Sequence, residues 1–141
     1  MDYREAYEKA LQLLNVRFLS EGELKAKLRR RGVDDDVLED VVAALEGEHF
    51  LDDQRLARDV YRYYARKGQY GHLYIVNRLR RRCLPVPEDV EQPDEYALAG
   101  DLVKRKFSYR ADEARKAARF LQYRGFSPSV IRDVLEDFTV H

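Results

Sequence analysis

The sequence predicts an all-α protein in which short helical units repeat along the chain. Three observations predict this class. Apolar residues and a glycine recur at the same spacing in two segments, with a degenerate copy between them. Ala, Leu, Arg and Glu, which favour helices, dominate the composition. The apolar residues also follow the period of amphipathic helices. We therefore expect tandem three-helix repeats, about nine helices in all, stacked into an elongated, curved molecule.

The repeated pattern places a leucine four residues before a glycine, and an apolar residue directly after that glycine. The three copies are Leu24-Leu28-Gly32-Val33, Ile75-Leu79-Cys83-Leu84 and Ala117-Leu121-Gly125-Phe126. Because a short helix pair cannot bury its apolar face alone, such units stack and form an extended surface that usually binds something. The prediction is a single helical-repeat domain over residues 1–141, with a leading helix (1–19), repeat 1 (20–68), repeat 2 (69–109) and a partial repeat 3 (110–141).

Caps and turn residues mark the helix boundaries in the first half of the chain. Helical spacing of apolar residues predicts a leading helix over 3–18. Ser20 and Glu23 have the spacing of a capping box, which predicts a helix from about residue 21 to 31. Gly32 suits the left-handed position that ends this helix. Asp34 then caps the next helix, with Val33 and Leu38 at the spacing of a hydrophobic staple.

The second half of the chain has similar signals. Asp52 or Asp53 caps a helix that ends near Gly68, and a further helix covers 71–82. Pro85 and Pro87 interrupt the pattern, so we expect a turn and then only a short helix at 87–92. Cys83 occupies the place of the turn glycine, which predicts a different angle at the second turn. The last three signals are an Asp94 cap, a Gly125 helix end and a Ser127 cap followed by Pro128.

The formal net charge is zero, but basic and acidic residues are segregated along the chain. Residues 60–87 hold seven basic residues, no acidic residue and five of the ten tyrosines. Basic residues interleaved with aromatics suit a phosphate backbone with stacked bases, or an acidic protein groove. Arginines also occupy equivalent places before each turn, where they exceed what interaction with the helix dipole requires. Tyr61 and Tyr64 have core spacing, whereas Tyr63 is a candidate for binding.

The sequence predicts no catalytic residue, metal or cofactor. His49, His72 and His141 lie far apart without ligand-like spacing, and the single cysteine has no nearby histidine. One cysteine also excludes an intramolecular disulfide framework. No apolar run exceeds about five residues, so no membrane segment is expected. We expect a soluble, cytoplasmic protein.

Several segments together carry a family resemblance. They are Ala10-Leu11 with Leu14 and Arg17, Ser20-Glu21-Gly22-Glu23-Leu24, Leu28 to Val33, Phe50 to Ala57, and Gly71 with Ile75 and Leu79. Leu51-Asp52-Asp53 followed by Leu56-Ala57 is the most specific of them. With the closing segment from Leu121 to Phe126 in the expected order, the sequence resembles the RecX regulatory proteins, bacterial modulators of the RecA recombinase, over nearly its whole length.

The resemblance implies a curved protein of tandem three-helix units that binds RecA filaments in their groove and inhibits strand exchange and ATP hydrolysis. Members of the family also bind DNA, single- or double-stranded. The alternatives are a helical-repeat DNA-binding module that acts without a protein partner, and a structural adaptor for another acidic surface. A monomer suits a protein that enters a groove. The candidate partner- or DNA-binding residues are Arg29, Arg30, Arg31, Lys67, Tyr70, Tyr74, Arg78, Arg80, Arg81, Arg82, Arg119 and Arg124.

Overall fold

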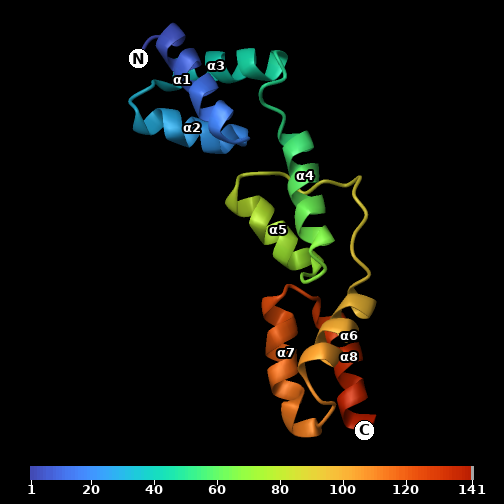
Figure 1. The fold of residues 1–141 in the computed structure, drawn as a ribbon. Coiled ribbons are helices and arrows are strands. Elements are labelled where there is room, and N and C mark those ends of the chain that lie inside the picture. The colour runs from blue at the N-terminus through green and yellow to red at the C-terminus, as the bar shows by residue number, and fades with distance from the viewer. Residues whose placement is uncertain (141) are drawn as a thin grey trace. The chain divides into compact units, whose positions relative to one another are not determined.

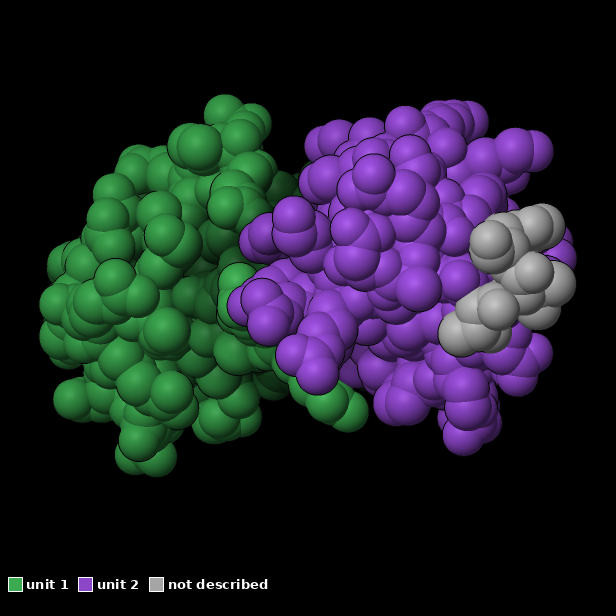
Figure 2. All heavy atoms as spheres, turned by 90° about the horizontal axis from the view of Figure 1, so that it is seen from below, with its two compact units in different colours: residues 1–59, 79–87 green, residues 60–78, 88–141 purple. Residues whose placement is uncertain are grey.

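Helices form the whole of the secondary structure in residues 1–140, which are the residues that the computed structural model describes (Figure 1). Eight α-helices and one three-residue 3-10 helix are present in this range, and no strand. The prediction of an all-α class is therefore confirmed. The chain divides into two compact units, residues 1–59 with 79–87 and residues 60–78 with 88–141 (Figure 2). The predicted repeat boundaries stay a prediction, since the units divide inside two helices.

Unit 1 contains three complete helices, α1 (Tyr3–Val16), α2 (Glu21–Arg30) and α3 (Asp35–Gly47), and the first part of α4 (Asp53–Arg66). These three pack against one another through apolar faces that amphipathic spacing creates. The fully buried members of this core are Ala6, Ala10, Leu24, Leu28, Leu38, Val41 and Leu45. The predicted capping box is present, because Ser20 Oγ accepts from the Glu23 N–H and the Glu23 carboxylate accepts from the Ser20 N–H.

Unit 2 contains the second part of α4, the first part of α5 (His72–Arg81) and the closing helices α6 (Glu95–Lys106), α7 (Ala114–Tyr123) and α8 (Pro128–Val140). The short 3-10 helix η1 (Ala111–Glu113) precedes α7. Helices α6, α7 and α8 share an apolar core. Its fully or nearly fully buried members are Ala99, Val103, Ala117, Leu121, Phe126, Val134 and Phe138. Asp94 caps α6 by accepting from the Ala97 N–H at 3.2 Å, as predicted.

The three repeat turns have one backbone conformation. Gly32, Cys83 and Gly125 all have positive φ, at 84°, 57° and 82°. After each of them, the next residue donates its N–H to the carbonyl five residues back: Val33 to Leu28 at 3.2 Å, Leu84 to Leu79 at 2.9 Å and Phe126 to Leu121 at 3.1 Å. This is the glycine-type helix ending. Cys83 keeps this type of ending because it adopts the left-handed conformation despite its Cβ, and a different angle at the second turn stays a prediction.

Two predictions need correction. No helix forms at 87–92, where the chain bends through residues 88–90 and resumes helical structure only at Glu95. Pro87 begins this stretch, and Pro93 directly after it disfavours helical backbone angles at residue 92, so the few residues left are too short for a stable helix. Asp34 is at the N-cap of α3 with extended φ and ψ, but its side chain makes no capping hydrogen bond.

Among residues 1–140, the helices are too short and too polar to cross a membrane.

Candidate functional site

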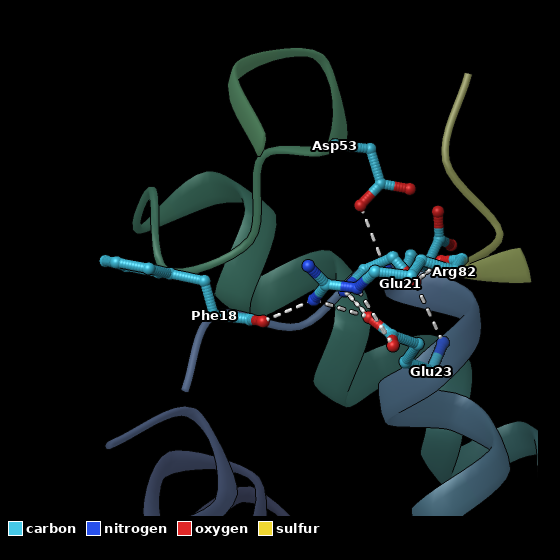
Figure 3. A network of polar contacts seen from close by, with 6 residues as sticks. Phe18, Glu21, Glu23, Asp53 and Arg82 are labelled. Carbon is cyan, nitrogen blue, oxygen red and sulfur yellow. Dashed lines mark hydrogen bonds and ion pairs between the residues drawn. The ribbon is translucent and has the colours of Figure 1, made fainter. Parts of the chain in front are cut away.

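In unit 1, the turn after α5 docks on the start of α2 (Figure 3). Ser20 Oγ donates to the Arg82 carbonyl at 2.5 Å. The Glu21 N–H, which has no partner within its own helix, donates to Asp53 Oδ1 at 2.9 Å. Gly22 permits this approach, since a Cβ there would lie 2.7 Å from the Cβ of Cys83. We call this arrangement the unit 1 joint.

An ion pair locks the unit 1 joint. The Arg82 guanidinium donates to both carboxylate oxygens of Glu23, at 3.2 and 3.0 Å, and to the Phe18 carbonyl at 2.8 Å. Both ion-pair side chains are about four-fifths buried. Burial alone would raise the pKa of Glu23, but hydrogen bonds from Arg82 and from the Ser20 N–H outweigh it and lower that pKa. Arg82, a predicted binding residue, is therefore engaged inside the protein.

Unit 2 has the corresponding joint, formed by the turn after α7 and the start of α5. The Gly71 N–H donates to the Arg124 carbonyl at 2.7 Å, and the Leu73 N–H to the Gly125 carbonyl at 3.1 Å. Backbones meet so closely here that a Cβ on Gly71 would lie 2.5 Å from the Gly125 oxygen. Arg124 donates to the side-chain oxygen of Gln69 at 2.9 Å, and Gln69 is the repeat equivalent of Phe18. We call this arrangement the unit 2 joint.

Tyrosines and cations surround the unit 2 joint. The repeat alignment that pairs Leu24 with Ile75 places Tyr74 where the unit 1 joint has Glu23. The rings of Tyr70 and Tyr74 stack at 3.9 Å with an interplanar angle of 5°. Arg78 donates to the Tyr74 hydroxyl at 3.1 and 2.8 Å. The whole set, which we call the aromatic–cation cluster, is Tyr63, Tyr64, Lys67, Tyr70, Tyr74, Arg78 and Arg124.

The cations of the aromatic–cation cluster lie over ring faces. Lys67 Nζ is 4.7 Å from the Tyr63 ring centre, and the Arg78 and Arg124 guanidinium carbons are 5.1 and 5.6 Å from the rings of Tyr74 and Tyr70. Such geometry is that of a cation–π contact. No ion pair joins these three cations to a carboxylate among residues 1–138. Their charge therefore stays available to an anionic partner.

The cluster also shifts the acidity of its own groups. A hydrogen bond with Tyr63 raises the pKa of Lys67, and one with Tyr74 raises the pKa of Arg78, so both remain cationic. Burial works to raise the pKa of Tyr74, but hydrogen bonds with Arg78 and Tyr70 outweigh it and lower that pKa. The phenol of Tyr74 is thus polarised by the cations beside it.

An apolar groove lies next to the cluster in unit 2. Its volume is about 740 Å³, and it lies between α5, α7 and α8. Leu73 and Tyr74 come from α5, Tyr123 from the end of α7, and Ile131 and Leu135 from α8. Sequence analysis missed this groove, because these residues come from separate helices and none has an unusual local pattern. The one available signal was Tyr74, which lines both the groove and the cluster.

The other predicted site residues are on exposed helix ends and faces. Arg29, Arg30 and Arg31 lie at the end of α2, where Arg29 pairs with Asp35 at 3.0 Å. Arg80 and Arg81 are exposed at the end of α5, and Arg119 is exposed on α7. Within unit 1, the joint is at the start of α2 and the Arg29–Arg31 cluster at its end, about 13 Å away along the helix axis. The alignment of all the arginines along one wall stays a prediction.

The tyrosine and histidine predictions have mixed outcomes. Tyr61 is fully buried, as expected, and accepts or donates a 2.8 Å hydrogen bond with His72 Nδ1. Tyr64 is only half-buried, whereas Tyr63 is exposed. His49 and His72 belong to different units, and His141 lies outside the described residues. Within 1–140 no group of three or more His, Cys, Asp or Glu is arranged around a potential metal position.

Similarity to known proteins follows the repeat pattern. Residues 6–45 match the family model described as RecX, first three-helix domain, and residues 93–135 match RecX, third three-helix domain. The first of these covers most of α1 to α3, and the second covers α6, α7 and much of α8. The segment between the two matches contains Cys83 and the prolines that replace the expected short helix.

Relatives with the name "Regulatory protein RecX" come from several bacteria. The chain is 32% identical to the Vibrio cholerae protein over 96% of this chain and 94% of that one, and 32% identical to the Pelodictyon phaeoclathratiforme protein over 89% and 84%. It is 31% identical to the Geobacillus kaustophilus protein, of which it spans only 56%. The chain thus covers about half the length of the longer relatives.

A solved structure has the same fold. The crystal structure of RecX from Lactobacillus salivarius superimposes with a TM-score of 0.79 at 21% identity, and the match covers 99% of this chain and 98% of that one. At this level of identity the similarity establishes the fold alone. Together with the two matched three-helix domains and relatives above 30% identity, it leads to one conclusion: the chain belongs to the RecX family of regulatory proteins.

Proposed function

We propose that this protein binds filaments of a RecA-type recombinase and inhibits their ATPase and strand-exchange activities, and thereby modulates recombination and DNA repair. Membership of the RecX family supports this proposal. The observation that carries it is the aromatic–cation cluster. There, Lys67, Arg78 and Arg124 keep their charge free of carboxylates beside packed tyrosine rings.

Such a surface has two roles in binding. Exposed positive charge mainly accelerates encounter with an acidic partner and sets the register of the complex. Large, rigid aromatic rings then slow dissociation, because they bury much apolar area with little loss of conformational freedom. Arg30, Arg80, Arg81 and Arg119 add exposed charge outside the cluster. Arg82 is omitted from this surface, since Glu23 already neutralises it.

The test follows ATP hydrolysis and co-sedimentation of preformed recombinase filaments while the protein is added. Lys67→Glu with Arg78→Glu reverses two charges of the cluster, and Arg80→Glu with Arg81→Glu reverses two exposed charges in unit 1. Each double variant should raise the half-inhibitory concentration about tenfold or more, since like-charge contacts cost several kcal/mol. Arg115→Glu with Lys116→Glu, on the exposed surface of α7, is the matched control. Full inhibition by the cluster variant would reject this surface.

A second candidate is a DNA-binding module that acts without a protein partner. The stacked pair of Tyr70 and Tyr74 beside Arg78 supports it, because aromatic rings with adjacent cations suit stacked bases and phosphates. Contact with five to seven phosphates would give a log–log salt slope of roughly −4 to −6. A titration with bare oligonucleotides separates the two candidates. Weak binding to bare DNA at physiological salt, with retained binding to recombinase filaments, favours the protein partner.

A further inference from the structure

The apolar groove of unit 2 has no role in the cation contacts on which the proposed function rests. Its volume of about 740 Å³ lies in the range of roughly 300–1,000 Å³ that is typical of binding sites. Three helices form most of its walls, and Gly125 and Phe126 of the turn between α7 and α8 complete them; all of these elements pack on the core of unit 2. The groove is therefore present before any partner arrives.

Exposed apolar side chains border this groove. Leu73 is 48% exposed and Tyr123 is 81% exposed, although both lie beside apolar neighbours on α8. Ile131 and Leu135 are only partly covered by the core of unit 2. Scattered exposed apolar residues need no explanation, but several that line one hollow indicate a surface that another molecule covers.

Two arginines lie in or beside the apolar wall. Arg132 lines the groove itself and is exposed, without an ion pair among residues 1–138. Arg78 donates to the hydroxyl of Tyr74, whose side chain is part of the wall. Glu136 on α8 is the single carboxylate that lines the groove. An occupant with apolar anchors and flanking negative charge fits this distribution.

We propose that the groove binds a short amphipathic α-helix of a protein partner, with bulky apolar residues on one face and Asp or Glu beside them. The apolar anchors enter between Leu73, Tyr123 and Ile131, and the carboxylates face Arg78 and Arg132. A helix with a diameter of about 10–12 Å presents such anchors at i, i+3, i+4 and i+7. This inference rests on the proposed function in one respect, namely that the partner is a protein and not a nucleic acid.

The probe is a fluorescein-labelled peptide of about 16 residues, roughly four helical turns, with leucines at the anchor positions and glutamates elsewhere. Three further probes separate the contributions of charge, apolar anchors and partner class. They are the same peptide with each glutamate replaced by lysine, the same peptide with each leucine replaced by serine, and an oligothymidine. Fluorescence anisotropy with the full chain measures binding. The acidic, apolar peptide should bind about tenfold or more tightly than either altered peptide.

Two variants test the groove with this peptide. Leu73→Ser removes an apolar wall residue, and Arg132→Glu reverses the charge inside the groove. Each should weaken the acidic peptide about tenfold, while Val16→Ser, which changes an 84% exposed residue of unit 1, should not. If circular dichroism shows that Leu73→Ser has lost helicity, Tyr123→Ser replaces it, because a side chain that is 81% exposed carries little of the core.

The outcomes separate the groove from the proposed function. If both groove variants bind the acidic peptide as tightly as the native protein does, the proposal that the groove binds an acidic helix is overturned. Tighter binding of oligothymidine than of the peptide, lost in the same variants, overturns it in favour of nucleic acid. If the protein binds the peptide in the groove but does not bind recombinase filaments, the acidic-helix site is supported and the proposed function is rejected. If it inhibits filaments but does not bind the peptide, the proposed function is supported and the acidic-helix site is rejected.

Discussion

The two joints have the same backbone plan and different chemistry. In each, a turn with positive φ docks on the start of an earlier helix, and an arginine before the turn residue reaches residue 18 or its repeat equivalent, residue 69. In unit 1 a carboxylate, Glu23, neutralises that arginine. In unit 2 the corresponding position is Tyr74, and Arg124 lies over aromatic rings instead.

The difference shows how one repeat contact can serve two purposes. An ion pair that is about four-fifths buried fixes geometry, but its charge is not available to a partner. An arginine held by an amide oxygen and by ring faces is also positioned, but it keeps its net charge. We infer that the unit 1 joint is mainly structural and that the unit 2 joint is adapted for binding.

The largest expected effect comes from the turn glycines. Gly125→Ala should destabilise the protein by about 3 kcal/mol, the sum of left-handed strain and forced overpacking. The new Cβ would lie 2.2 Å from the Tyr74 nitrogen. Gly32 has nearly the same φ, 84° against 82°, but open space around its Cβ position. Gly32→Ala should therefore cost only about 1 kcal/mol in urea denaturation. Equal costs would show that the unit 2 joint contributes no close packing.

Sequence reasoning found the turns because glycine carries the information locally. Gly32 and Gly125 stand after apolar residues at helical spacing, and only the backbone of these residues determines the ending. Cys83 has the same type of helix ending without this local signal. Its local preference opposes positive φ, yet the packing of its Cβ against Gly22, 61 residues earlier in the chain, accompanies that conformation. Tertiary contacts of this kind leave no local pattern.

The next effect concerns the arginines of the joints. Arg82→Ala leaves Glu23 largely buried without its partner and should lower the free energy of unfolding by about 2 kcal/mol. Arg124→Ala removes cation–π contacts and two exposed hydrogen bonds to Gln69, so its cost should be about 1 kcal/mol. Urea denaturation measures both. Inhibition of recombinase filaments should show the reverse order, with Arg124→Ala the more defective. The same order in both assays would contradict the division of roles.

The smallest effect is a pH dependence confined to unit 1. The folded-state pKa of Glu23 is lowered, so its contribution to stability is complete above the ordinary carboxyl pKa of about 4.3 and is lost as the pH falls through the folded value. The stability difference between the native protein and Glu23→Gln should therefore shrink from pH 7 to pH 3. Tyr74→Phe is the control, since a phenol ordinarily titrates near pH ~10 and its difference should stay constant over this range. A constant difference for Glu23→Gln would show that the ion pair adds nothing to folding.

The candidate site was only partly predictable. Tyr70, Tyr74 and Arg78 could be identified because an acid-free, tyrosine-rich stretch is visible along the chain. Whether each arginine is neutralised by a carboxylate could not be predicted. Arg82 and Arg124 occupy equivalent repeat positions, and only the folded structure shows that one meets a carboxylate 59 residues away while the other meets aromatic rings. Neutralisation depends on the partner, and repeat spacing does not encode it.

The parallel pair of phenol rings at Tyr70 and Tyr74 gives this chain an intrinsic optical signal. The protein contains no tryptophan, so tyrosines dominate its near-ultraviolet absorption. Two rings only 3.9 Å apart couple their electronic transitions, and their near-ultraviolet circular dichroism depends on the angle between them. Because Tyr74 also lines the groove, a molecule that enters the groove and tilts this ring would change that spectrum without any attached dye.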